Sequence, residues 1–157
     1  MMGLALAIAG AAFAVIFAGI GSAVGVGTAG RAGAGVVSEK PELFGKVLLL
    51  EALPGTQGIY GFLVAFIVML QTGLLGGTPK ELTVAQGLVI FAACLPVAFG
   101  GMLSGIHQGK VSAAGLNIVA KQPDKSGNAV ILSAMVETYA LLGLVISILT
   151  VLFFKLD

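Results

Sequence analysis

One carboxylate lies in the middle of a long apolar segment near the end of the chain. Between Gly127 and Phe154 the only charged side chain is Glu137. A charged residue at the centre of a membrane helix costs roughly 2.5–3.5 kcal/mol, so this carboxylate must be neutralised or must face polar groups. A protonated acid that links two helices would be a structural explanation, whereas ionisable groups inside membranes are by default functional.

Uncharged side chains that bear oxygen lie in an earlier segment, "LPGTQGIYG" (53–61). Thr56, Gln57 and Tyr60 are spaced i, i+1 and i+4, so in a helix they share one face. Pro54 has no backbone N–H and kinks the helix, which leaves backbone carbonyl groups near the kink free to turn toward a ligand. Three side chains and a kinked backbone could therefore present oxygens to one point.

Gln108 adds another amide from a third segment. These groups either form hydrogen bonds between helices, as membrane Thr and Gln often do, or surround Glu137 as a cage of neutral oxygens. Such a cage suits a hard cation. One carboxylate and one monovalent ion are together neutral, whereas a divalent ion would leave a positive charge in the membrane. The pattern therefore predicts Na⁺, Li⁺ or H⁺ as the bound species.

Other motifs in the chain are weaker candidates for chemistry. "GVGTAG" (25–30) fits the glycine pattern of dinucleotide-binding proteins, and Glu51 follows it, but no strand precedes it. The sole histidine, His107, has no neighbouring cysteine or histidine and is assigned a packing or interfacial role. Cys94 lies in an apolar run, where we expect a small packing residue.

The composition is that of an integral membrane protein. Hydrophobic residues make up 58% of the 157 residues and charged residues 10%, against about 25% charged in soluble domains. A net charge of +1 argues against nucleic-acid binding. The first charged residue is Arg31, so the N-terminal apolar stretch lacks the basic region of a signal peptide and is interpreted as a retained span.

Apolar stretches that cross a bilayer need about 20 residues, and the chain has four of them. We therefore predict an all-α membrane protein with four transmembrane helices. Lysines gather around the first and third breaks between the spans, so we place these two loops in the cytoplasm and both termini outside. The predicted spans are 3–36, 43–74, 82–119 and 127–154, and the breaks are 38–42, 76–81 and 121–127.

The two halves of the chain are similar, which indicates a duplicated helical hairpin. Residues 17–27 parallel 102–112, and residues 39–57 parallel 121–139. We place the hairpins at 1–76 and 77–157, within a single membrane domain. The alignment sets Gly55 opposite Glu137, so two hairpins share one carboxylate.

The first span is rich in small residues. Seven glycines occur between residues 18 and 35, including the pair Gly21-x-x-x-Gly25. Small residues let membrane helices approach closely. We expect this span to pack against protein, much of it against copies of itself, which favours an oligomer.

The duplicated hairpin, "LPGTQGIYGF", "SGIHQGKVSAAG" and "AMVETYALLGLVIS" together resemble the proteolipid (K or c) subunit of bacterial V-type ATPases, and most closely its sodium-translocating members. The likeness runs over nearly all residues. It implies a membrane rotor ring of identical subunits, with spans one and three inside and spans two and four outside. It also implies a stator membrane subunit that carries an arginine, and central-stalk subunits. ATP hydrolysis on other subunits would drive rotation, and this chain would catalyse nothing alone.

The resemblance also implies a role for each candidate residue. Glu51 has no place in this pattern, and it would point to the cytoplasmic side, face a neighbouring subunit, or approach the ion site and disturb its neutrality. The expected ion site consists of Glu137 as the carrier, side-chain oxygens of Thr56, Gln57 and Gln108, the carbonyl of Leu53, and Tyr60, whose hydroxyl would hold Glu137.

Three alternatives remain open at this point. The same rotor could carry H⁺ in place of Na⁺. A small secondary transporter would bind its substrate at mid-membrane between inverted repeats, whereas these hairpins run parallel. A purely structural membrane protein would use the glycine-rich faces for assembly, but it would have no need of Glu137.

Overall fold

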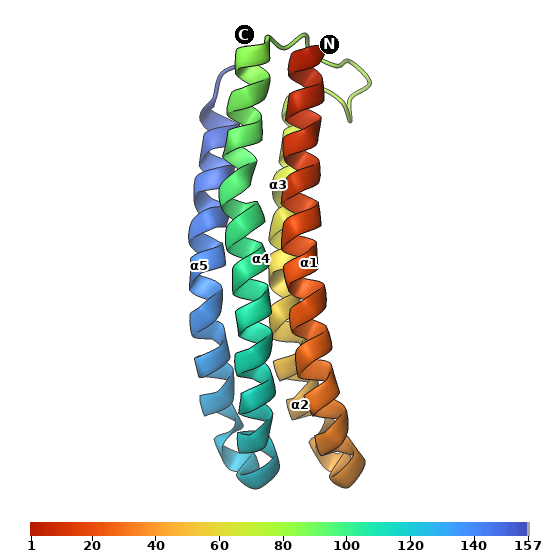
Figure 1. Cartoon of the computed structure of the whole chain (residues 1–157), viewed down its shortest axis with the longest axis vertical. Helices are drawn as coiled ribbons and strands as arrows, with labels where there is room; N and C mark the ends of the chain where they lie inside the picture. The colour runs from red at the N-terminus through yellow and green to blue at the C-terminus, as the bar shows by residue number, and fades with distance from the viewer. Residues whose placement is uncertain (157) are drawn as a thin grey trace.

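The computed structural model describes residues 1–156 as a bundle of long helices that run side by side (Figure 1). Three spans are single helices, α1 (Met2–Glu39), α4 (Val84–Lys121) and α5 (Ser126–Phe153). No strand occurs among these residues, and four segments are long and apolar enough to cross a membrane. The prediction of an all-α protein with four spans is confirmed. The second span is composite, with η1 (Pro41–Leu43), α2 (Phe44–Ala52), η2 (Leu53–Gly55) and α3 (Thr56–Gln71).

The connection between the two hairpins begins and ends at defined residues. The second span was expected to reach residue 74, but it ends at Gln71 because Gly73 adopts a φ of +75°, which a residue with a Cβ rarely does. The third span was expected from residue 82. It begins after Thr83, whose hydroxyl accepts from the backbone of Gln86 while the Gln86 side chain accepts from the Thr83 N–H.

The connections alternate between the two ends of the bundle. The N-terminus, the loop before α4 and the end of α5 lie at one end, and the turns at η1 and η3 (Pro123–Lys125) lie at the other (Figure 1). The two loops predicted to be cytoplasmic are therefore on the same side. Their assignment to the cytoplasm itself stays a prediction.

Glycines bring α1 and α4 into close backbone contact. A Cβ added at Gly21 would lie 2.5 Å from the Cα of Met102, and one at Gly25 would meet the carbonyl of Gly105. The Gly21-x-x-x-Gly25 pair therefore packs against α4 of the same chain and not against another copy. By contrast, a Cβ added at Gly19, Gly27 or Gly35 would have no atom within 4 Å. Those glycines, on the other face of α1, remain open for the contact between copies that the sequence predicts.

The buried side chains form an apolar cluster on each side of a polar layer. The cluster toward the chain ends includes Val64, Val97 and Cys94, which is fully buried, as expected of a packing residue. The cluster toward the η1 and η3 turns includes Leu50 and Leu116. Between these clusters the bundle buries Ser22, Gln57, Ser104, Gln108, Ser112 and Ser133. Polar groups thus collect near the middle of the bundle, where a membrane offers no water to satisfy them.

Candidate ion-binding site

Glu137 lies in the interior of α5 and is partly buried in the polar layer. Thr56 Oγ1 donates to Glu137 Oε1 at 2.7 Å, and the Tyr60 hydroxyl donates to the same oxygen. Gln108 Nε2 donates to the other carboxylate oxygen at 3.3 Å. The structure therefore brings side chains from α3 and α4 to the one carboxylate, as the sequence pattern indicates.

A local break in the second span positions the α3 side chains. Pro54 is fully buried and lies in η2, so the span narrows to a 3₁₀ turn at Leu53–Gly55 before α3 starts at Thr56. The predicted irregularity at Pro54 is thus present. Thr56 and Tyr60 follow one helical turn apart on the face that meets α5.

Oxygen atoms crowd around the Thr56 hydroxyl. Thr56 Oγ1 lies 2.7 Å from Glu137 Oε1, 3.0 Å from the Leu53 carbonyl and 3.4 Å from Gln57 Oε1. A hydroxyl has one hydrogen, which it can give to only one of these three oxygens at a time. This side of Glu137 is therefore rich in oxygen lone pairs and poor in hydrogens, which is the environment that a hard cation prefers.

Gln57 and Gln108 are both fully buried and bonded to one another. Gln57 Nε2 donates to Gln108 Oε1 at 2.5 Å. Gln108 therefore turns its nitrogen toward Glu137, whereas the resemblance implies that its oxygen takes part in the site. A half-turn of the Gln108 amide would exchange the two atoms, but it would also set the NH₂ group of Gln108 against that of Gln57. The role of Gln108 as an oxygen ligand stays a prediction.

One serine belongs to this network although the sequence analysis did not select it. Ser104 Oγ accepts from Gln57 Nε2 at 3.1 Å and donates to the carbonyl of Val136 at 3.0 Å. Ser104 precedes Gln108 by one helical turn on α4, so its spacing could have marked it as a residue of the same face.

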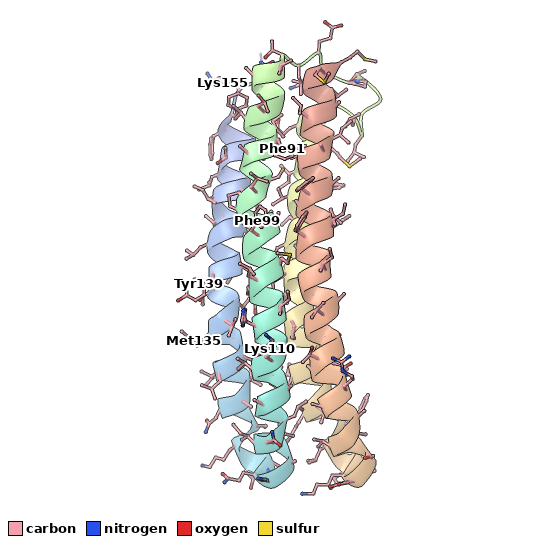
Figure 2. The ribbon with its side chains drawn as sticks, viewed as in Figure 1. Phe91, Phe99, Lys110, Met135, Tyr139 and Lys155 are labelled. Atoms are coloured by element: carbon pink, nitrogen blue, oxygen red, sulfur yellow. The ribbon has the colours of Figure 1, made fainter. Side chains whose placement is uncertain are left out.

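Neither Glu51, whose place the sequence leaves open, nor His107, to which it assigns a packing or interfacial role, has a described hydrogen bond to Glu137. Glu51, on α2, packs against α1, where its Oε1 would lie 2.7 Å from a Cβ added at Gly30. It takes no part in the hydrogen bonds described for the carboxylate of Glu137. His107 is exposed and lines a groove between α4 and α5 together with Tyr139, which points away from the bundle (Figure 2).

The site has the donor set of a main-group cation. Within residues 1–156 no three His, Cys, Asp or Glu side chains gather in a way that could hold a metal ion. One carboxylate with hydroxyl, amide and carbonyl oxygens offers hard ligands and a single negative charge. The arrangement could bind a monovalent cation or hold a proton.

Comparison with known proteins adds a family to this geometry. The family described as the ATP synthase C-subunit family matches residues 2–68 and 91–150, which cover most of each hairpin. The V-type sodium ATPase subunit K of Enterococcus hirae is 50% identical over 150 residues, or 96% of this chain and 92% of that protein. The resemblance stated from the sequence is thereby confirmed.

More distant relatives share the same segment. The A-type ATP synthase subunit K of Methanocaldococcus jannaschii is 41% identical over 146 residues, which are 93% of this chain but only 61% of that protein. The V-type proton ATPase 16 kDa proteolipid of Nephrops norvegicus is 31% identical over 139 residues, 88% of this chain and 85% of that protein. The names of the relatives thus include both sodium and proton ATPases.

Proposed function

The chain belongs to the ATP synthase C-subunit family, and we propose that it is a rotor-ring subunit of a V-type ATPase that carries Na⁺ across the membrane on Glu137. Several identical copies form the ring. The ring works with a stator membrane subunit, which supplies an arginine, and with central-stalk subunits. ATP hydrolysis on other subunits drives its rotation.

The observation that carries this proposal is the cluster of oxygens beside Glu137. A proton on the carboxylate occupies one bond and needs no further oxygens. Na⁺ needs several oxygens to replace its hydration shell, and this need accounts for Thr56, Gln57 and the Leu53 carbonyl lying together next to a carboxylate. The sodium ATPase subunit K of Enterococcus hirae, at 50% identity, supports the same ion.

Each residue of the site has a proposed task. Glu137 supplies the negative charge, and Tyr60 holds the carboxylate through its hydroxyl. Thr56, Gln57 and Gln108 supply side-chain oxygens, and Leu53 supplies its carbonyl. Gln108 Oε1 accepts from Gln57 Nε2 with one lone pair and has a second lone pair to contribute to the ion.

Charge neutrality explains how such a site couples ion movement to rotation. An ionised, empty Glu137 is costly to expose to lipid, so a site enters the lipid only when it is filled. Na⁺ enters and leaves where the ring meets the stator. There the stator arginine favours release because it replaces the ion as the positive partner of Glu137. This chain itself is a non-catalytic part of the complex.

The proposed orientation follows from the ends of the bundle. The η1 and η3 turns share one end, and the lysines at this end support a cytoplasmic position for it, with both termini outside. We place the two units of the duplication at 1–76 and 77–157. A small secondary transporter remains the less favoured function, because family membership and parallel hairpins both support a ring subunit.

Carbodiimide labelling of the purified ring tests the proposal. The reagent attacks the protonated carboxyl group, so bound Na⁺ should protect Glu137. We expect Na⁺ to slow labelling at neutral and alkaline pH, with weaker protection as the pH falls because protons then compete for the carboxylate. Choline chloride at equal ionic strength is the control, and Li⁺ tests a substitute ion. Labelling that is indifferent to Na⁺ would reassign the protein to proton transport.

A further inference from the structure

We propose that Ser104 is a positioning residue of the ion site, which orients the Gln57 amide so that its oxygen faces Na⁺. The inference rests on the proposed function. Ser104 has no hydrogen bond to Glu137 among the described residues and acts through Gln57.

A backbone carbonyl determines which atoms donate and which accept in the hydrogen bonds of Ser104. The Val136 carbonyl can only accept, and Ser104 Oγ, 3.0 Å away, gives it the single hydrogen of the hydroxyl. Toward Gln57 the same Ser104 oxygen must then accept. The group of Gln57 that faces Ser104 is therefore the nitrogen, 3.1 Å away, and not the oxygen.

The remaining atoms of Gln57 follow from that choice. Its NH₂ group has two hydrogens, one for Ser104 Oγ and one for Gln108 Oε1 at 2.5 Å. With the nitrogen committed on that side, Oε1 is directed to the other side, where Thr56 Oγ1 lies 3.4 Å away and donates in turn to Glu137. The amide of Gln57 thus presents its acceptor to the oxygen cluster and its donors away from it.

Burial makes this orientation matter. Gln57 is fully buried and Ser104 is 5% exposed, so water does not take over either bond when one partner is removed. In the Ser104→Ala variant one N–H of Gln57 has lost its acceptor. Only the bond to Gln108 then opposes a turn of the amide, and a turned amide directs NH₂ hydrogens toward the cation, which they repel.

The same hydroxyl also joins the two parts of the site. Val136 directly precedes Glu137 on α5, and Ser104 lies one turn from Gln108 on α4. Ser104 therefore fixes the amide from α3 relative to the backbone that carries the carboxylate. Its position in the network, between a ligand and the carrier segment, separates it from serines that only join helices.

The test is Na⁺ protection of Glu137 from carbodiimide in purified rings of the wild type, Ser104→Ala and Ser104→Thr. We expect Ser104→Ala to raise the Na⁺ concentration for half-protection roughly three- to tenfold, the change that corresponds to one neutral hydrogen bond. Labelling without Na⁺ should keep its pH profile, since a proton on Glu137 does not use Gln57. Ser104→Thr retains the hydroxyl and should restore much of the protection. Ser104 is one of the residues that line the adjoining groove of about 330 Å³.

Ser112→Ala is the matched control for a purely structural role. Ser112 and Ser133 are fully buried and bonded at 2.7 Å, so this variant also removes one hydrogen bond between α4 and α5. It should leave the half-protecting Na⁺ concentration unchanged.

The outcomes separate the inference from the proposed function. A wild type without Na⁺ protection would refute the proposed function. A protected wild type with unchanged protection in Ser104→Ala, or with equal losses in Ser104→Ala and Ser112→Ala, would overturn the inference alone. If Ser104→Ala does not yield rings, Ser104→Thr and Ser104→Cys take its place. The inference then requires near-wild-type protection with Thr and weaker protection with Cys, whose thiol is a weak donor and acceptor.

Discussion

The hydroxyl of Thr56 offers the sharpest test of the oxygen cluster, because valine has nearly the same shape and lacks only the polar atom. Thr56 Oγ1 donates to Glu137 Oε1 at 2.7 Å. In the proposed site the lone pairs of the same oxygen contribute to Na⁺. A hydrogen bond to a charged group contributes roughly 1.5–3 kcal/mol. If Na⁺ binding depends on this oxygen to that extent, Thr56→Val should raise the half-protecting Na⁺ concentration roughly tenfold to a hundredfold.

Thr138→Val is the matched control, because Thr138 directly follows Glu137 in the sequence. Thr138 is exposed on α5, and its hydroxyl donates to the Met135 carbonyl of its own helix at 2.8 Å. The substitution is chemically the same and lies next to Glu137 in the sequence, yet it removes nothing from the oxygen cluster. It should leave the half-protecting Na⁺ concentration unchanged.

Two assays on detergent-purified rings compare the Na⁺ affinity of Thr56→Val with that of Thr138→Val. They are isothermal titration with Na⁺ and protection from carbodiimide. A native gel in mild detergent first establishes that each variant still forms rings. If both variants bind Na⁺ as tightly as the wild type, the crowding of oxygens at Thr56 is a packing feature, and the ligand assignment is refuted.

Three further predictions concern Glu137, the glycines on the two faces of α1, and Gln108. Glu137→Gln should assemble into rings but lose ion transport, whereas Glu51→Gln should keep Na⁺ protection. Transport by reconstituted rings tests the first variant and carbodiimide labelling tests the second. Ion transport by Glu137→Gln would refute the assignment of Glu137 as the carrier. Gly25→Leu should prevent folding, since the new side chain meets the Gly105 carbonyl and the Pro54 ring in its own chain, whereas Gly27→Leu enters open space and should fold but impair ring formation. Circular dichroism and native gels compare the two, and identical behaviour would contradict the assignment of the two faces. Gln108→Leu should raise the half-protecting Na⁺ concentration while labelling without Na⁺ persists, and unchanged protection would remove Gln108 from the site.

The sequence predicts the fold well because a membrane allows few alternatives. Backbone groups in lipid must be satisfied within a segment, so apolar stretches of this length become helices. The four spans follow from length and composition alone. Their ends are less predictable, because Leu82 is as apolar as the helix that follows, and only the Thr83 cap sets the start of α4.

Which residues meet is harder to predict than which residues are polar. Thr56 and Tyr60 could be placed on one face by spacing, and Glu137 stood out by its charge. The orientation of the Gln108 amide depends on the hydrogen bond from Gln57, and this bond is a contact between helices that no spacing within one helix contains. The helix against which Gly21 and Gly25 pack could not be predicted for the same reason. A face of small residues fits a helix of the same chain as well as one of another copy.

The division of the site between the two hairpins explains why a duplicated chain has only one carboxylate in this site. Thr56, Gln57 and Tyr60 come from the first hairpin, and Gln108 and Glu137 come from the second, so neither hairpin holds the cluster alone. Gly55, aligned with Glu137 in the first hairpin, packs toward α1, where a Cβ would lie 3.6 Å from Val26 Cγ2 and a longer side chain would press on an apolar contact. A carboxylate there would have no oxygen cage and would carry the cost of an unpaired charge. The first hairpin thus supplies Thr56, Gln57 and Tyr60, and the second supplies the charge together with Gln108. The proposed site therefore takes one ion per four helices.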